Sequence, residues 1–328
     1  MRSSFVIPHS PLAPRHFPMN NITFLSDYLA ASVRLSVPLA FAALGGLFSE
    51  RSGVLNIGLE GMLLTGAFVS AAGTFYSGNA WFGVAAAVMA GALVGLLHAY
   101  LSVTLRVDQL VSGLAINLSA AGLTAFGSRL VFTAETTQKL AGIDAIALPG
   151  LSQLPIIGSL FNQDLIVYGL FVLVPLTTYL LFRTSLGLTL RAVGEYPRAA
   201  DTAGIWVGRV RYSCVVISGG LAALGGAYLV LVHVKYFTEG ISAGKGYIAL
   251  AALIFGRWHP VGTVLACLLF GATEALQLRV QAFNLNIPYQ LLTMLPYITA
   301  LLALVGLAGK STPPSALGIP YIKEGSGR

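Results

Sequence analysis

The chain has 328 residues, of which 56% are hydrophobic and only 9% are charged, and its mean hydropathy is +0.79. Because an ordinary soluble domain carries roughly 25% charged residues, this composition excludes a fully solvated surface and indicates a membrane protein. The formal net charge of +7 does not indicate nucleic-acid binding. The basic residues stand in short loops between apolar runs, where they set the orientation of a membrane protein.

The first 27 residues are predicted to form a flexible tail. They contain four prolines, which interrupt helices, and they lack the apolar stretch of a secretory signal. Residues 28–309 are then predicted to form the membrane domain, followed by a polar cytoplasmic tail at 310–328.

Apolar segments follow one another along the membrane domain, and about nine transmembrane helices are predicted, with eight to ten as the range. Most segments approach the roughly 20 residues that a spanning helix needs, and the seventh is short. The fold class is therefore an all-α polytopic membrane protein. The predicted spans are 27–48, 54–75, 81–105, 110–132, 165–182, 212–232, 247–255, 262–278 and 289–307.

The most polar stretch between two spans is the loop at 183–211, with five arginines and two acidic residues. Its middle predicts one short helix, because Pro197 suits a first helical turn and Gly204 suits a helix end. A short exposed helix flanked by arginines suits docking to a cytoplasmic partner. A loop that only fixes orientation is the alternative.

The distribution of lysine and arginine predicts the orientation of the chain. With loop 183–211 inside, most basic residues and the C-terminus are also inside. The N-terminus is then outside, where Arg2 and Arg15 fit poorly.

A weak internal repeat relates two halves, predicted at about 28–133 and 210–308. The sequence AALGG occurs at 42–46 and again at 222–226. The first copy lies on a span that runs inward and the second on one that runs outward, so the two halves have inverted topology. In many transporters the transport path lies at the interface of such repeats and is formed by broken helices.

Each half contains a Gly-rich polar stretch that interrupts an apolar segment, and these stretches predict the transport path. Broken helices at membrane depth persist only where they line a cavity or pack within protein, and a carboxylate there is usually functional. Instead of lining the path, Glu60 could pair with Arg51 or cap a helix. The side-chain amides of the asparagines and the glutamine could join helices by hydrogen bonds instead. The predicted path residues are Asn56, Gly58, Glu60, Asn117, Lys245, Glu274 and Gln277.

Four runs of the sequence resemble the permease subunits of bacterial ATP-binding-cassette importers. They are GGLFSERSGVLNIGLEGML, VSGLAINLSAAGLT, LGLTLRAVGEYPRAADTAGI and LIFGRWHPVGTVLACLLFGATEALQ. The wider family handles branched-chain amino acids and simple sugars, and the resemblance is greatest to its nucleoside-uptake branch. It covers about residues 30–309.

The resemblance implies that loop 183–211 holds a coupling helix, which seats in a cytoplasmic ATP-binding-cassette ATPase and transmits its closure to the spans. It also implies a second, similar permease subunit, an extracytoplasmic solute-binding lipoprotein and a place in the bacterial inner membrane. ATP and Mg would belong to the ATPase, since this chain has no Gly-x-x-x-x-Gly-Lys-Ser/Thr run, and no cofactor or metal is expected on the chain. The coupling residues are Arg191, Val193, Gly194, Glu195, Pro197, Arg198, Ala199, Ala200, Asp201, Gly204 and Ile205.

The expected function is import of a small polar solute, foremost a nucleoside, by a transport subunit that is not itself an enzyme. A simple sugar or a branched-chain amino acid is the alternative solute. A channel or an ATP-independent secondary transporter would need no coupling helix. A membrane enzyme is disfavoured, because the acids and histidines show no nucleophile–base or metal spacing.

Overall fold

The computed structural model describes residues 21–132, 140–154, 156–282, 288–306 and 312–323. Helices dominate it, as predicted, and strands β1 (Ile146–Ala147) and β2 (Asn162–Gln163) form one short antiparallel pair. The helices are α1 (Asn21–Arg51), α2 (Leu59–Ser77), α3 (Ala80–Ala99), α4 (Gln109–Val131), α5 (Leu165–Arg183), α6 (Ser185–Glu195), α7 (Pro197–Thr202), α8 (Val207–Tyr228), α9 (Lys245–Phe255), α10 (Pro260–Ala282), α11 (Tyr289–Thr293) and α12 (Leu295–Gly306).

One correction concerns the N-terminal end of the chain, and one further observation concerns the C-terminal end. Helix α1 begins at Asn21, so the last residues of the predicted N-terminal tail are helical, and residues 1–20 lie outside the described part. The predicted C-terminal tail packs against the protein over residues 312–323, which we call the C-terminal strap.

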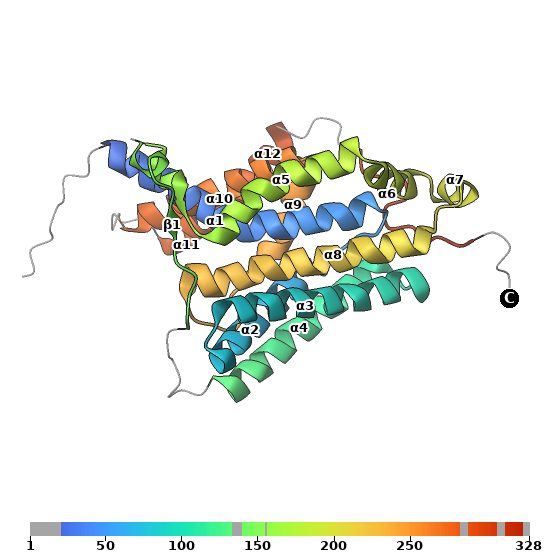
Figure 1. Ribbon diagram of the computed structural model, residues 1–328, viewed down its shortest axis with the longest axis horizontal. Coiled ribbons are helices and arrows are strands. Elements are labelled where there is room, and N and C mark those ends of the chain that lie inside the picture. The colour runs from blue at the N-terminus through green and yellow to red at the C-terminus, as the bar shows by residue number, and fades with distance from the viewer. Residues whose placement is uncertain (1–20, 133–139, 155, 283–287, 307–311, 324–328) are drawn as a thin grey trace, which may run out of the picture.

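Helices α1 and α8 form the centre of the molecule and run antiparallel (Figure 1). Small residues make their contact: a Cβ added at Gly45 would lie 2.7 Å from the carbonyl oxygen of Ser218, and one added at Gly225 would lie 2.7 Å from that of Pro38. Because Gly45 and Gly225 are the same position of the repeated AALGG sequence, the contact is reciprocal. An inverted repeat predicts this arrangement.

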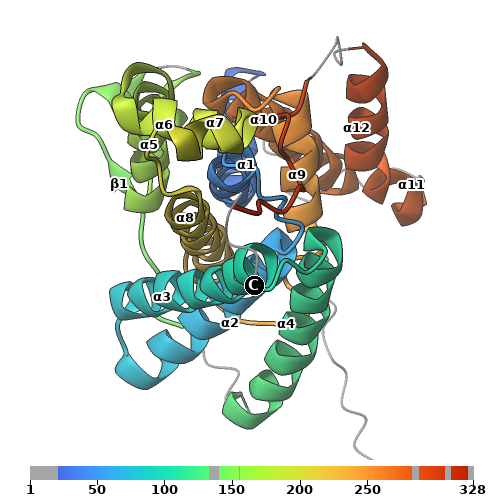
Figure 2. The same cartoon turned by 90° about the vertical axis from the view of Figure 1, so that its right-hand side faces the viewer.

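Two groups of helices flank the central pair on opposite sides (Figures 1 and 2). Helices α2 and α3 pack on α8, whereas α9 and α10 pack on α1. Glycines permit both approaches, since a Cβ at Gly91 of α3 would lie 2.3 Å from the carbonyl oxygen of Gly219, and one at Gly271 of α10 would lie 2.5 Å from that of Ser32. Each half therefore packs its later helices on the central helix of the other half.

The predicted count of nine spans is not confirmed. Within the described residues, six helices are long and apolar enough to cross a membrane. Helix α2 contains Glu60 in its first turn and is not among the six. Helix α9 has only 11 residues, about 16 Å at 1.5 Å per residue, and the predicted ninth span is divided into α11 and α12. The six are 24–51, 80–104, 109–131, 165–183, 207–234 and 260–281.

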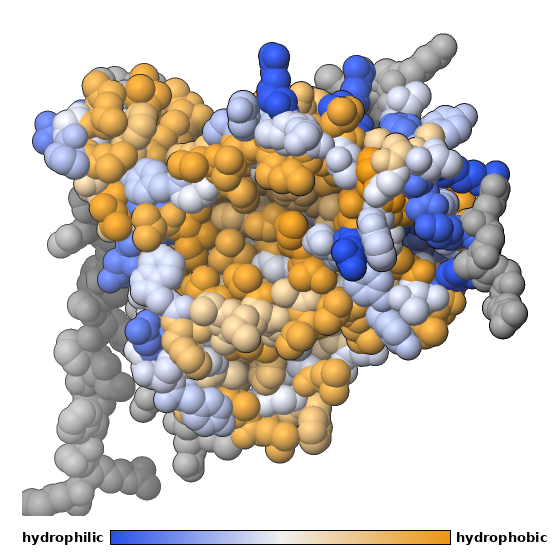
Figure 3. Space-filling view, turned by 45° about the vertical axis from the view of Figure 1, so that its right-hand side comes forward, coloured by the Kyte–Doolittle hydropathy of each residue, from blue (hydrophilic) through white to orange (hydrophobic). Residues whose placement is uncertain are grey.

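The surface divides into an apolar and a polar part. In Figure 3 hydrophobic residues cover most of the face along the helices, and hydrophilic residues gather at the end that holds α6 and α7. Helices α3 and α4 carry large apolar side chains that are 64% to 76% exposed, namely Met89, Leu93, Leu118, Leu123 and Phe126. Such a surface suits lipid or another membrane subunit, and the protein is a multi-pass membrane protein.

Candidate transport path and coupling surface

Helices α2 and α9 both begin beside the carboxylate of Glu60. Its Oε1 accepts hydrogen bonds from the hydroxyl of Ser242 at 2.5 Å and from the backbone N–H of Gly244 at 2.9 Å, and its Oε2 accepts one from the N–H of Gly246 at 2.7 Å. Two helix N-termini therefore face one half-buried carboxylate, and both favour its negative charge. Of the alternatives for Glu60, the capping role is present, and the carboxylate caps α9 rather than pairing with Arg51.

The segment before α9 needs small residues to reach Glu60. Gly240 and Gly244 have φ of +68° and +81°, and Ala243 has φ of +48°, a region that favours glycine. A Cβ at Gly246 would lie 2.4 Å from the backbone nitrogen of Glu60. The two Gly-rich stretches that the repeat places in equivalent positions therefore bind each other directly.

Asn117 brings α4 to the same place. Its Oδ1 accepts a hydrogen bond from the N–H of Gly61 at 2.7 Å, and its amide nitrogen donates to the carbonyl of Ile57 and to the hydroxyl of Tyr247, both at 3.0 Å. This one side chain caps α2 and connects it to α9. The structure thus places Asn117, as a residue that joins helices, next to Glu60 and its donors Ser242, Gly244 and Gly246, which we call the Glu60 cluster.

Asn56 and Gly58 complete the turn before α2. The buried amide of Asn56 donates to the hydroxyl of Ser218 on α8 at 2.9 Å, while its Oδ1 has no hydrogen-bond partner in the described part of the chain. A Cβ at Gly113 of α4 would lie 2.9 Å from the backbone nitrogen of Gly58. The start of α2 is therefore held by α4, α8 and α9 together.

A cavity of about 190 Å³ lies on the other side of the segment before α9. Lys245 and Glu274 line it, with Nζ 2.7 and 2.9 Å from the two carboxylate oxygens. Arg34 of α1 and His233 also line the cavity. Neither residue was predicted to line the path, although Arg34 carries a signal for a functional site, a basic residue within an apolar span.

Gln277 stands apart from the other predicted path residues. It lies one turn beyond Glu274 on α10, but it does not line the cavity and makes no hydrogen bond to the residues that the structure describes. Its role in the path stays a prediction.

The short helix of the loop forms where it was predicted. Helix α7 begins at Pro197, and Gly204 follows it with φ of +84°. Helix α6 precedes it and was not predicted. The side chain of Thr184 caps α6 by accepting a hydrogen bond from the N–H of Gly187 at 3.2 Å.

Only some of the predicted coupling residues are available to a partner. Val193, Gly194 and Ala200 are buried, whereas Arg198, Ala199 and Gly204 are exposed, and Pro197 and Ile205 are intermediate. The N–H of Ile205 bonds the carbonyl of Ala200 at 3.0 Å, and the guanidinium of Arg191 lies 5.1 Å from the centre of the Phe182 ring.

The acidic residues of the loop bind the C-terminal strap. One carboxylate oxygen of Glu195 accepts hydrogen bonds from the backbone N–H of Ser315 at 3.1 Å and from its hydroxyl at 2.9 Å. Asp201 forms an ion pair with Lys323 at 3.4 Å. These two side chains therefore bind the same segment, the C-terminal strap. Apart from Glu195, the predicted coupling residues that are exposed are Arg198 and Ala199 on α7 and Gly204 just after it.

Known sequences resemble the chain over nearly its whole length. Residues 28–305 match the family described as "Branched-chain amino acid transport system / permease component". The chain is 40% identical over 316 residues to the guanosine ABC transporter permease protein NupQ of Bacillus subtilis (strain 168), covering 93% of this chain and 99% of that protein.

Two further relatives cover similar shares. The nucleoside ABC transporter permease protein NupC of Lactococcus lactis subsp. cremoris (strain MG1363) is 38% identical over 317 residues, which are 93% of this chain and 100% of that protein. TsgC13 of Haloferax volcanii, provisionally named a glucose ABC transporter permease protein, is 34% identical over 323 residues, which are 91% of this chain and 96% of that protein.

Proposed function

Because the chain belongs to the family of permease components of branched-chain amino acid transport systems, we propose that it is the membrane-spanning subunit of an ATP-driven nucleoside importer. The observation that carries the proposal is the identity of 38% to 40% to two permeases named for guanosine and nucleoside transport. Both similarities extend over more than nine-tenths of the chain. The protein has a transport role rather than a catalytic one.

The partners follow from the family. A cytoplasmic ATP-binding-cassette ATPase, which carries ATP and Mg, would bind the exposed face of α7. A second, similar permease would cover part of the apolar surface of α3 and α4, and an extracytoplasmic lipoprotein would deliver the solute at the inner membrane of the bacterium. The exposed face of α7 and the apolar side chains on α3 and α4 support these assignments.

The path residues divide into two roles. The three donors on its two oxygens leave the Glu60 carboxylate little capacity for a solute, so we assign to Glu60, with Asn56, Gly58 and Asn117, the task of shaping the path. Lys245 and Glu274 line a cavity and can exchange their mutual bonds for bonds to hydroxyl groups of a ribose. The ring of Tyr247, which is 44% exposed, is suited to stack on a base.

A chain of contacts connects the end of α1 to this region. The Nε of Arg51, at the end of α1, donates to the carbonyl of Trp258 at 2.8 Å, and the indole N–H of Trp258 donates to Glu50 at 2.6 Å. Trp258 follows α9, whose first residues bind Glu60. Movement of the end of α1 would therefore reach α9 and the path through packed side chains.

The test is uptake of labelled guanosine by cells that contain the complete transporter, with and without this chain. Unlabelled uridine, ribose, glucose and leucine serve as competitors. We expect uptake to require the chain and to be reduced by uridine, but not by the other three. Competition by glucose or ribose alone would contradict the nucleoside assignment and favour a sugar, the second candidate, which the similarity to TsgC13 supports.

Depleting ATP, and separately collapsing the ion gradients, distinguishes the importer from a secondary transporter. Uptake that survives ATP depletion and fails with the gradients would contradict ATP coupling.

A further inference from the structure

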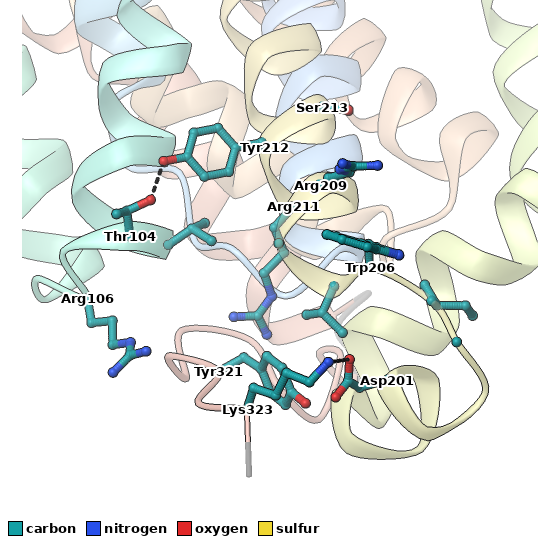
Figure 4. Close-up of a pocket in the computed structure, with 15 residues that line it drawn as sticks. Thr104, Arg106, Asp201, Trp206, Arg209, Arg211, Tyr212, Ser213, Tyr321 and Lys323 are labelled. Carbon is teal, nitrogen blue, oxygen red and sulfur yellow. Dashed lines mark hydrogen bonds and ion pairs between the residues drawn. The ribbon is translucent and has the colours of Figure 1, made fainter. Parts of the chain in front are cut away.

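The C-terminal strap is attached to the segment that carries α7. The N–H of Ala316 donates to the carbonyl of Gly194 at 2.9 Å, and Ser315 donates twice to Glu195, the last residue before Tyr196 and α7. At the far end of the strap, Lys323 pairs with Asp201 of α7 itself (Figure 4). The strap therefore binds both the residue before α7 and the last turn of α7.

The same strap binds the ends of the two central helices. The N–H of Gly318 donates to the carbonyl of Gly53, in the turn that follows α1, at 3.2 Å. Arg211, in the second turn of α8, donates from Nη1 to the carbonyl of Ile319 at 2.9 Å. Figure 4 shows the Arg211 side chain extending from α8 toward the strap.

Arg211 makes the position of α8 dependent on the strap. The residue is only 1% exposed, and its Nε and Nη2 have no hydrogen-bond partner in the described part of the chain. Among the described residues, the carbonyl of Ile319 is thus the one acceptor that binds this buried cation. A buried charge without an acceptor is costly, so removal of the strap favours a shift of α8 that hydrates the guanidinium.

The end of α6, the turn after α1, the start of α8 and the strap are packed too closely to move independently. A Cβ at Gly194 would lie 2.1 Å from the carbonyl oxygen of Arg51, and one at Gly53 would lie 2.9 Å from Nη2 of Arg211 and 3.2 Å from the carbonyl oxygen of Ala316. Close-packed contacts transmit displacement rather than absorb it. A displacement of α6 and α7 therefore acts on α1, α8 and the strap together.

We propose that the C-terminal strap is a positioning element of the transport cycle, which couples the movement of α7 to the adjacent ends of α1 and α8. The proposal rests on the proposed function, in which α7 docks the ATPase. It assigns to residues 312–323 a role that neither the spans nor the loop performs alone. Since α1 and α8 form the centre of the molecule, their displacement reaches the Glu60 cluster.

The test uses the complete transporter reconstituted in lipid vesicles, with solute transported per ATP hydrolysed as the readout. One variant ends after residue 311. A milder one, Ala316→Pro, keeps the strap but removes the N–H that binds Gly194 and fixes the backbone at that position. The controls are Ser315→Thr, which keeps both donors to Glu195, and the exposed Thr312→Ala. A coupling free energy of ordinary size predicts that the first two variants lose about fivefold or more of the solute moved per ATP, while basal ATP hydrolysis and ATPase co-purification remain and both controls behave as the wild type.

Two results would overturn the proposal. The first is that the shortened chain moves as much solute per ATP as the wild type. The second is that both variants lose ATPase binding together with transport, which is the result expected if the strap only stabilises the fold. Hydrogen exchange of residues 45–53 and 207–218, with and without a non-hydrolysable ATP analogue, repeats the test independently of the solute. We expect the analogue to change exchange there in the wild type and not in the shortened chain. A wild-type transporter that moves no nucleoside contradicts the proposed function alone, and the exchange result still decides on the strap.

Discussion

Glu60 holds the starts of α2 and α9 with a single carboxylate. Its three donors come from Ser242, Gly244 and Gly246, so its replacement affects two helices at once. This contact explains why an acidic residue is tolerated in the first turn of an apolar helix. Its charge is matched by two N–H groups at the start of α9 and by the hydroxyl of Ser242, rather than by a basic side chain.

Replacement Glu60→Gln should lower both stability and transport. The amide retains one oxygen but directs its NH₂ group at N–H donors, and leaving such donors unsatisfied costs about 1–3 kcal/mol each. Thermal unfolding of the purified transporter and nucleoside uptake measure the two effects. Asp108→Asn, which makes the same change at the exposed cap of α4, is the control. Normal uptake kinetics in the Glu60 variant would contradict the assigned role.

The Lys245–Glu274 pair should behave as a unit. Its side chains are 12% and 26% exposed, so removing one partner leaves a poorly solvated charge. Glu274→Gln or Lys245→Gln should each lower stability by about 1–3 kcal/mol, below the 3–5 kcal/mol of a fully buried pair because some solvent reaches it. The double variant should recover part of the stability but not the uptake. Additive losses in a thermal-unfolding cycle would show that the two residues act independently.

Sequence reasoning located some of these residues and missed their contacts. Glu60 was identifiable because a carboxylate stands out in an apolar run. Its binding to Gly244 and Gly246 was not, because the hydrogen bonds join residues more than 180 positions apart. Arg34 reaches the cavity from α1 and His233 from the segment that follows α8, and no local pattern shows that these two segments meet beside α9 and α10.

The central helices α1 and α8 depend on the absence of side chains at matched positions. Gly45→Val and Gly225→Val should destabilise the protein to similar extents, by about 1–3 kcal/mol each, because each forces a side chain against the backbone of the other helix. Gly169→Ala on α5, where a Cβ meets nothing within 4 Å, is the matched control. Thermal unfolding in detergent gives the comparison, and a large loss at only one of the two glycines would argue against reciprocal packing.

Substitutions on the exposed face of α7 should leave folding intact but impair function. Ala199→Arg places a long charged side chain on the surface that would enter the ATPase, so we expect the variant to insert normally and to lose ATPase co-purification and uptake. Thr312→Arg, exposed on the nearby strap, controls for added charge. Unimpaired co-purification of the Ala199 variant would contradict docking through α7.

Element prediction succeeded where local chemistry decides and failed where long-range packing decides. Pro197 and Gly204 mark the start and the end of α7, because their own backbone preferences suit those positions. Hydropathy could not show that α9 stops short of crossing, because an apolar run of 11 residues reads as a shortened span. Nor could it show that the strap packs, since its contacts to Gly53 and Arg211 have no periodic signal.

At the scale of the whole molecule, the repeated AALGG sequence predicted two spans of opposite direction. The structure adds that these two helices pack against each other at the centre and that the halves exchange their flanking helices. In the proposed function, the solute passes where the two Gly-rich stretches meet. The coupling loop and the C-terminal strap lie at one end. Helices α1, α8 and α9 connect this end to the region of Glu60. ATP-driven movement at α7 must therefore change the position of Glu60 if the proposed function is correct.

ATP-driven uptake by the reconstituted transporter tests this central claim most directly. Vesicles would contain this chain, its permease partner and the ATPase, with the receptor and labelled guanosine outside and ATP inside. The account predicts that guanosine accumulates with ATP, that a non-hydrolysable analogue abolishes accumulation, and that unlabelled nucleosides compete. Accumulation driven by an ion gradient without ATP, or ATP-driven uptake of ribose or leucine but not of nucleosides, would contradict it.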